Sequence, residues 1–375
     1  MVSLNTAYSS SSYASLASSI AAGIASTAKT ASSAASTSST VASDSAATNI
    51  TLSDAAKAAL ETKDLATVLS EVREKLTALL TAAGRTSPLQ NDKLALDLTS
   101  LDPRELYAIA GSSTDAFTAD EKKAAGLEMQ RRFDAAMAGP AAIAKVTGSY
   151  SGLYKAAADY LDSLGPEERA DPKTVAARAA LTEGLKQLAA DPKTLPTDVE
   201  DDPVALYLAL ADAGETTGPR PIEDVADDVR TALDKKYADA LANGRVPTFN
   251  KSSSVGTFVD LSSFDSRSLS AMVLNADNQF SDTEQSAAKA ILHTKSGAAL
   301  LAGFNNAAKS SDPTAFSQNV ISIYSSMSAE ERQAAGWSES FYKTAVDSYA
   351  TTSKLAQMLS EAGGDSTSFL SWIGK

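Results

Sequence analysis

The sequence predicts a mostly α-helical protein of two homologous multi-helix modules, with at most short strands, preceded by a Ser/Ala/Thr-rich N-terminal segment. The main observation is an internal duplication: residues 97–125 return as residues 260–288 without a gap, with 11 identities in 29 aligned pairs. The offset of 163 residues still holds at the Glu-Glu-Arg of residues 167–169 and 330–332. The second observation is that apolar residues recur at helical spacing between helix-capping signals along most of the chain.

The N-terminal segment, residues 1–50, differs in composition from the rest of the chain, because Lys29 and Asp44 are its only charged side chains. Apolar residues at spacings of three to five form a narrow stripe on a possible helix. We expect either a low-complexity tail or an export or assembly segment that becomes helical against a partner. The stripe consists of Leu4, Tyr8, Tyr13, Leu16, Ile20 and Ile24.

The opening residues Met1 to Thr6, Met-Val-Ser-Leu-Asn-Thr, resemble the start of a flagellin. This resemblance covers only a few residues. It implies export without a cleaved Sec signal and association with a surface appendage such as the flagellum.

The first helical module is predicted at residues 51–195 and the second at residues 222–375. Residues 196–221 between them are rich in Pro, Gly, Thr and Asp, which is typical of a linker. Each module opens with an amphipathic helix that ends at a glycine, Gly84 in the first and Gly244 in the second.

Short alternating stretches follow these helices at residues 94–98 and 257–261. Alternation with a period of two predicts brief strands, which could pair with each other across the two modules.

The best-matched part of the repeat is predicted as a helix, a loop and a second helix. A cap Asp begins the first helix, an Arg two residues later is expected to form an ion pair that orients it, and a Thr/Ser-x-x-Glu capping box begins the second helix. The residues kept in both copies are Asp102 and Asp265, Arg104 and Arg267, Phe117 and Phe280, and Glu121 and Glu284.

The second helix-loop-helix, residues 265–292, resembles a degenerate EF-hand. The resemblance places Asn275, Asp277 and Glu284 at the third, fifth and final ligand positions and so implies a calcium site. Val273 stands where the family has its first Asp, and Asn278 where it has Gly. A capping box with a buried aromatic residue is the alternative explanation. The first copy has Ala110 and Ser112 at the corresponding places, and we expect no metal there.

Composition restricts the functional classes. The net charge of −13 argues against a nucleic-acid partner, because phosphate binding needs clustered Lys and Arg. The absence of Cys removes thiol nucleophiles, disulfides and Cys-based zinc sites, and His293 is the only histidine. The sequence contains neither a run of about 18 apolar residues nor a Sec-type leader.

We therefore expect a non-enzymatic structural or interaction protein, bacterial and exported or associated with a surface appendage. The partner is expected to be a protein or further copies of the chain, engaged through the N-terminal segment. No cofactor is expected in this interpretation, and a cytoplasmic location is the alternative. The alternative functions are a calcium-responsive module using the second loop and an enzyme that relies on carboxylates alone.

Overall fold

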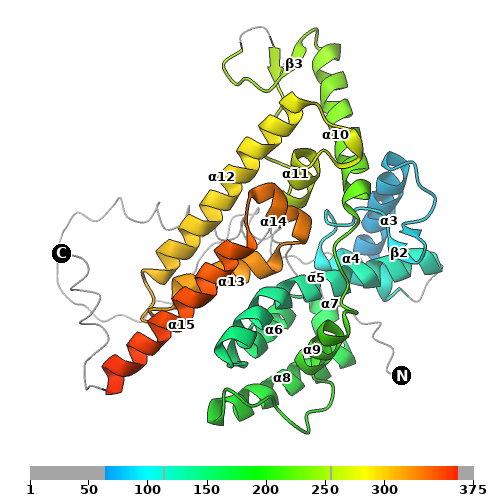
Figure 1. Cartoon of the computed structure of the whole chain (residues 1–375). Coiled ribbons are helices and arrows are strands. Elements are labelled where there is room, and N and C mark those ends of the chain that lie inside the picture. The colour runs from blue at the N-terminus through cyan, green and yellow to red at the C-terminus, as the bar shows by residue number, and fades with distance from the viewer. Residues whose placement is uncertain (1–63, 113–114, 254–255, 362–375) are drawn as a thin grey trace, which may run out of the picture.

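The computed structural model describes residues 64–112, 115–253 and 256–361 (Figure 1). The N-terminal segment and its predicted apolar stripe lie outside these residues. The prediction of a mostly α-helical protein with only short strands is confirmed, because the described elements are thirteen α-helices, one 3₁₀ helix and four strands of two or three residues.

The duplication recurs in the order of the elements. Six helices of the first copy each have a counterpart in the second, and the starts of the α4–α11, α5–α12 and α7–α14 pairs differ by the 163 residues seen in the sequence. The first copy contains α3 (Leu65–Ala82), α4 (Pro103–Ala110), α5 (Ala119–Thr147), α6 (Ser151–Asp162), α7 (Pro166–Arg169) and α8 (Pro172–Ala190). Their counterparts are α10 (Ile222–Ala242), α11 (Ser266–Val273), α12 (Asp282–Ala307), α13 (Ala315–Ser326), α14 (Ala329–Ala335) and α15 (Glu339–Glu361).

Helix α9 (Pro203–Ala213) lies within residues 196–221, the segment that the sequence predicts as a linker. Asp202 caps it by accepting the Val204 N–H at 2.9 Å. Val204 and Tyr207 are buried in the same core cluster as α6 and α8. This part of the connection therefore packs as an element of the first copy.

The prediction that strands of the two copies pair with each other is wrong, because each pair forms within one copy. In the first copy β1 (Leu89–Gln90) runs antiparallel to β2 (Lys93–Leu94). Asn91 and Asp92 between them both have positive φ, which suits a tight two-residue turn and closes the hairpin locally. In the second copy β3 (Val246–Thr248) lies parallel to β4 (Gly256–Phe258). A short 3₁₀ turn, η1 (Ala276–Asn278), follows α11.

The two copies are joined through helix α13, which lies against α5 of the first copy. Val320 and Ile321 of α13 form a core with Ala142, Ile143 and Val146 of α5. Two glycines allow the close approach. A Cβ at Gly139 of α5 would overlap Ser322 of α13, and one at Gly303 of α12 would overlap the Asn319 amide of α13. Helix α13 therefore packs closely between α5 and α12.

Candidate functional site

The predicted calcium ligands have other partners in the structure. The Glu284 carboxylate accepts the Tyr237 hydroxyl at 2.6 Å and Arg230 Nη1 at 2.9 Å, both from α10. The Asn275 Oδ1 accepts the Phe280 N–H at 2.8 Å, and Asp277 is exposed. No group of three His, Cys, Asp or Glu residues that could hold a metal ion exists in the part of the chain that the structure describes.

The Glu284 carboxylate is favoured in its charged form by the hydrogen bonds that it accepts from other groups of the protein. Burial raises its pKa, but hydrogen bonds from Tyr237, Ser281 and Arg230 outweigh the burial, and the net pKa lies below the ordinary value. The capping box with Ser281 is present, as predicted. The structure thus gives Glu284 a role in joining α12 to α10.

The first copy contains the same arrangement. Arg73 of α3 donates Nη1 and Nη2 to the two oxygens of Glu121 at 2.8 Å each, and Nη1 also donates to the Ala116 carbonyl at 3.2 Å. Its guanidinium lies 5.1 Å from the ring centroid of Phe117. In the second copy Arg230 contacts the Gln279 carbonyl and the ring of Phe280 in the same way. These contacts explain why both copies keep a Phe and a Glu at this place.

Sequence reasoning missed these two arginines. The signal was present, because Val72-Arg73 and Val229-Arg230 match at an offset of 157 residues. The offset differs from 163 because α10 is longer than α3, and a further insertion follows it before the best-matched part of the repeat.

The arginines that the sequence did single out join helices far apart in the chain. Arg104 donates Nε to Glu167 of α7 at 2.7 Å. Its counterpart Arg267 lies 3.8 Å from Glu330 of α14 and donates to the Ser328 hydroxyl at 2.9 Å. These two arginines therefore hold the fifth helix of each copy, α7 or α14, against the second helix, α4 or α11.

A cavity of about 250 Å³ lies between the copies, and we call it the inter-copy pocket. Its charged lining comes from both copies and from the segment that joins them. It includes Asp97, Arg131 and Asp134 of the first copy, Arg220, and Asp265, Arg267 and Glu331 of the second.

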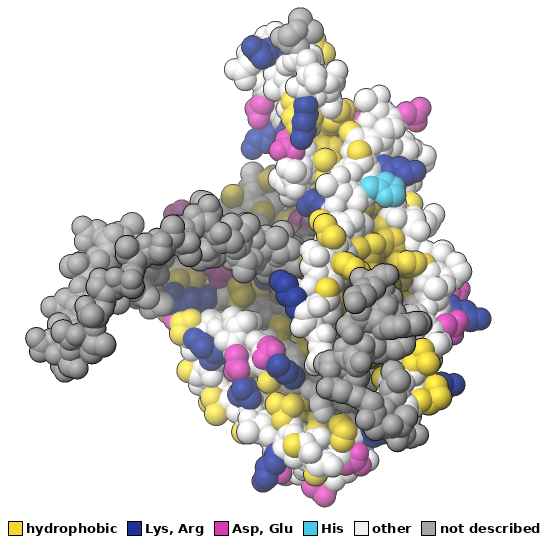
Figure 2. All heavy atoms as spheres, turned by 90° about the vertical axis from the view of Figure 1, so that its left-hand side faces the viewer, with side chains coloured by type: hydrophobic (Ala, Val, Ile, Leu, Met, Phe, Trp, Pro, Cys, Tyr) yellow, Lys and Arg dark blue, Asp and Glu magenta, His cyan; other side chains and the backbone are white. Residues whose placement is uncertain are grey.

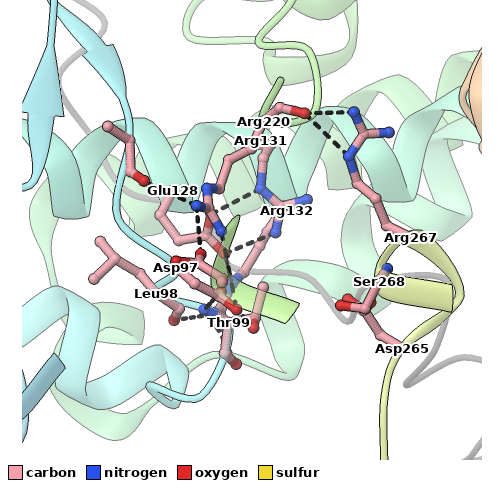
Figure 3. Close-up of polar contacts among 12 residues, drawn as sticks. Asp97, Leu98, Thr99, Glu128, Arg131, Arg132, Arg220, Asp265, Arg267 and Ser268 are labelled. Atoms are coloured by element: carbon pink, nitrogen blue, oxygen red, sulfur yellow. Dashed lines mark hydrogen bonds and ion pairs between the residues drawn. The ribbon is translucent and has the colours of Figure 1, made fainter. Parts of the chain in front are cut away.

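The three guanidiniums of the inter-copy pocket all contact the protein itself (Figure 3). Arg131 donates to both oxygens of Glu128 at 2.7 Å. Arg220 donates Nη2 to the Ala95 carbonyl at 2.8 Å and to Asp228 at 2.6 Å. Arg267 donates Nε to the carbonyl of Arg220 at 3.0 Å. Arg220 therefore ties the first copy to α10 and α11.

Burial raises the pKa of two pocket carboxyls, Asp134 and Glu331. At Asp134 it does so against hydrogen bonds from Thr217 and Gln130 that lower the pKa. At Glu331 it does so against the hydrogen bond from the Ser328 N–H, which also lowers the pKa. The lining thus combines three arginines with four carboxyls, and its arginines donate to groups of the protein itself.

A group of exposed apolar side chains lies on α12 and α13, and we call Leu301, Phe304 and Phe316 the apolar patch. Their exposed fractions are 60%, 56% and 40%. The rings of Phe304 and Phe316 meet edge to face with centroids 5.8 Å apart. Figure 2 looks onto this side of the molecule and shows hydrophobic side chains gathered on it.

Two of these three positions carry small residues in the first copy. The offset of 163 places Ala138 and Ala141 opposite Leu301 and Phe304, and it places the buried Leu153 opposite Phe316. The fold therefore does not need large side chains at the two positions on α12. This surface cannot be identified from the sequence, because the exposure of its side chains depends on which helices cover α12.

Comparison with protein-family models, curated proteins and solved structures found no match for the chain. In the described ranges, none of the helices combines the length and the apolar character needed to cross a membrane.

Proposed function

We propose that this protein is a non-enzymatic structural protein that associates with further copies of itself through the apolar patch. The observation that carries the proposal is the pair of exposed aromatic rings, Phe304 and Phe316, beside the exposed Leu301. Single exposed apolar residues are ordinary on protein surfaces, but contiguous exposed apolar side chains are typical of interaction sites.

The comparison of the two copies supports this interpretation. Helix α5 of the first copy folds with Ala138 and Ala141 at the positions of Leu301 and Phe304, so core packing does not account for these two large side chains on α12. Large aromatic side chains supply much of the binding energy when an interface buries them. An association that buries the apolar patch would give these side chains the cover that they lack within the described fold.

The internal use of the charged groups also supports a scaffold over an enzyme. Glu121 and Glu284 pair with arginines of α3 and α10, the first helix of each copy. Arg131, Arg220 and Arg267 line the inter-copy pocket but donate to protein acceptors. These contacts hold helices and copies in place.

We further propose export to the cell surface and assembly into an appendage, in which the N-terminal segment forms a second contact. The support is compositional: residues 1–50 are rich in Ser, Ala and Thr and nearly free of charge, and the chain contains no Cys. A chain with a net charge of −13 stays soluble before assembly, because like charges repel.

Sedimentation velocity over a wide range of concentrations tests the self-association. The variant with Phe304→Ser and Phe316→Ser should stay monomeric at concentrations where the wild type associates. The matched control carries Val175→Ser and Leu241→Ser, which remove two other exposed apolar side chains, 53% and 60% exposed. The proposal fails if the wild type is monomeric at every concentration, or if the patch variant and the control associate equally.

A further inference from the structure

We propose that residues 362–375 of the same chain dock on the apolar patch and thereby regulate self-association. This inference rests on the proposed function, because it assigns a regulator to the same surface. The segment contains Phe369, Leu370, Trp372 and Ile373, four large apolar side chains within five positions. Their chemistry matches a surface made of two aromatic rings and a Leu.

The end of α15 lies within reach of the apolar patch. The Ser317 and Ser348 hydroxyls, on α13 and α15, are 3.2 Å apart, and Ser317 follows Phe316 of the patch. Glu361 lies thirteen residues beyond Ser348 on the same helix, or about 20 Å along the helix axis. The chain must therefore return about this distance to bring apolar side chains onto the patch.

The following segment is long enough for that return. Phe369 lies eight positions beyond Glu361, and an extended chain of that length spans at most about 28 Å. Trp372 and Ile373 follow within four more residues and extend the reach. The four apolar side chains can therefore cover the patch without any change in the described helices.

Proximity favours this segment over the other occupants. A tether of this length gives the docking site a local concentration of about a millimolar or more, which a second copy reaches only in concentrated solution. The N-terminal segment precedes α3, which Figure 1 shows on the side of the molecule away from the ends of α12 and α15. Docking within one chain would keep the patch covered until another copy or the assembling structure displaces the segment.

Trp372 reports on the docking directly, because the chain contains only one other tryptophan, Trp337. The spectrum of Trp372 is the emission of the full chain minus that of the Trp372→Phe variant, which leaves the buried Trp337 in place. At concentrations where sedimentation shows a monomer, we expect emission at short wavelength and protection from acrylamide. The double variant Phe304→Ser with Phe316→Ser should shift the Trp372 emission to longer wavelength, and the control with Val175→Ser and Leu241→Ser should not.

A second measurement tests the regulation. Ending the chain after Glu361 should strengthen self-association by about tenfold or more, because a competing segment at high local concentration is removed.

The outcomes separate this inference from the proposed function. Trp372 emission at long wavelength that is the same in wild type and patch variant overturns the docking, and self-association through the patch would then stand by itself. Short-wavelength emission that develops only as the concentration rises assigns the patch to a second copy and also overturns it. If the Trp372 emission changes in the double variant Phe304→Ser with Phe316→Ser but the wild type never associates, the inference is supported and the proposed function is overturned.

Discussion

Replacement of Glu168 by Gln should remove a pH dependence of stability that the wild type carries and should stabilise the protein above about pH 8. Glu168 of α7 is fully buried, and neither carboxyl oxygen has a hydrogen-bond partner. Its counterpart Glu331 accepts the Ser328 N–H in a capping box, whereas the first copy has Gly165 at the cap position. The difference leaves Glu168 with burial as the main influence on its charge.

The magnitude follows from the pKa. Burial, with a smaller contribution from the negative charge of Asp171, raises the pKa of Glu168 from 4.5 to about 8. A carboxyl whose pKa is raised on folding holds its proton more tightly in the folded state. It therefore imposes no ionisation penalty below about pH 4.5, and stability falls as the pH rises from there to about 8. The full loss is about 5 kcal/mol for a difference of this size.

Gln cannot ionise, so its buried amide costs the same at every pH. That cost is about 1–3 kcal/mol for unpaired polar atoms, and the protonated Glu168, whose oxygens are equally unpaired, carries a similar cost. We therefore expect Glu168→Gln to be more stable than the wild type by up to about 5 kcal/mol at pH 9 and to lose this advantage near pH 5.

Urea unfolding at intervals between pH 5 and pH 9 measures the effect as the difference in the free energy of unfolding between variant and wild type. The control is Glu183→Gln, which removes a half-exposed carboxylate paired with Lys186. Its curve should run parallel to that of the wild type, because exposed ion pairs contribute at most about 1 kcal/mol. A difference between Glu168→Gln and wild type that does not change with pH would refute the assignment of a raised pKa.

Two further predictions concern the contacts that hold the helices together. Arg73→Met should lower the free energy of unfolding by about 2 kcal/mol in urea titrations at pH 7, because it leaves the buried Glu121 without its ion-pair partner, while the Thr118 N–H still donates to it. Burial alone raises the pKa of Glu121 and Arg73 lowers it, so the deficit should shrink as the pH falls below about 4. A deficit independent of pH would contradict this reasoning. Gly139→Ala should destabilise the protein by about 1–3 kcal/mol, because the added methyl group overlaps Ser322. The control Gly152→Ala, at a helix position with open space around it, should be neutral or stabilising by up to about 1 kcal/mol. Equal shifts of the melting temperature for the two variants would show that α13 does not approach α5 closely.

The sequence was sufficient for features that depend on neighbours along the chain. The capping boxes at Thr118 and Ser281 and the caps at Asp102 and Asp265 form as predicted, because each involves residues three positions apart. The repeat also predicts that the helices of the second copy follow one another in the same order as those of the first.

Features that depend on tertiary packing were not predictable in the same way. The partner of Glu121 lies 48 residues earlier in the chain and that of Glu284 lies 54 residues earlier, so an alignment at one fixed offset hides the shared Arg. The exposure of Phe304 depends on which helices cover α12. An aromatic residue at helical spacing is usually part of a core, and only the fold shows that this one is not.

The packing of α13 on α5 also has a consequence for synthesis of the chain. Ile143 and Val146 of α5 share a core with Val320 and Ile321 of α13. The ribosome adds Val320 and Ile321 roughly 175 residues after the two α5 residues. At about 5–20 residues per second, that face of α5 waits for about 10–35 s in a nascent chain that has otherwise finished its first copy. A chaperone, or the corresponding helix of a neighbouring nascent chain, has that interval in which to occupy it.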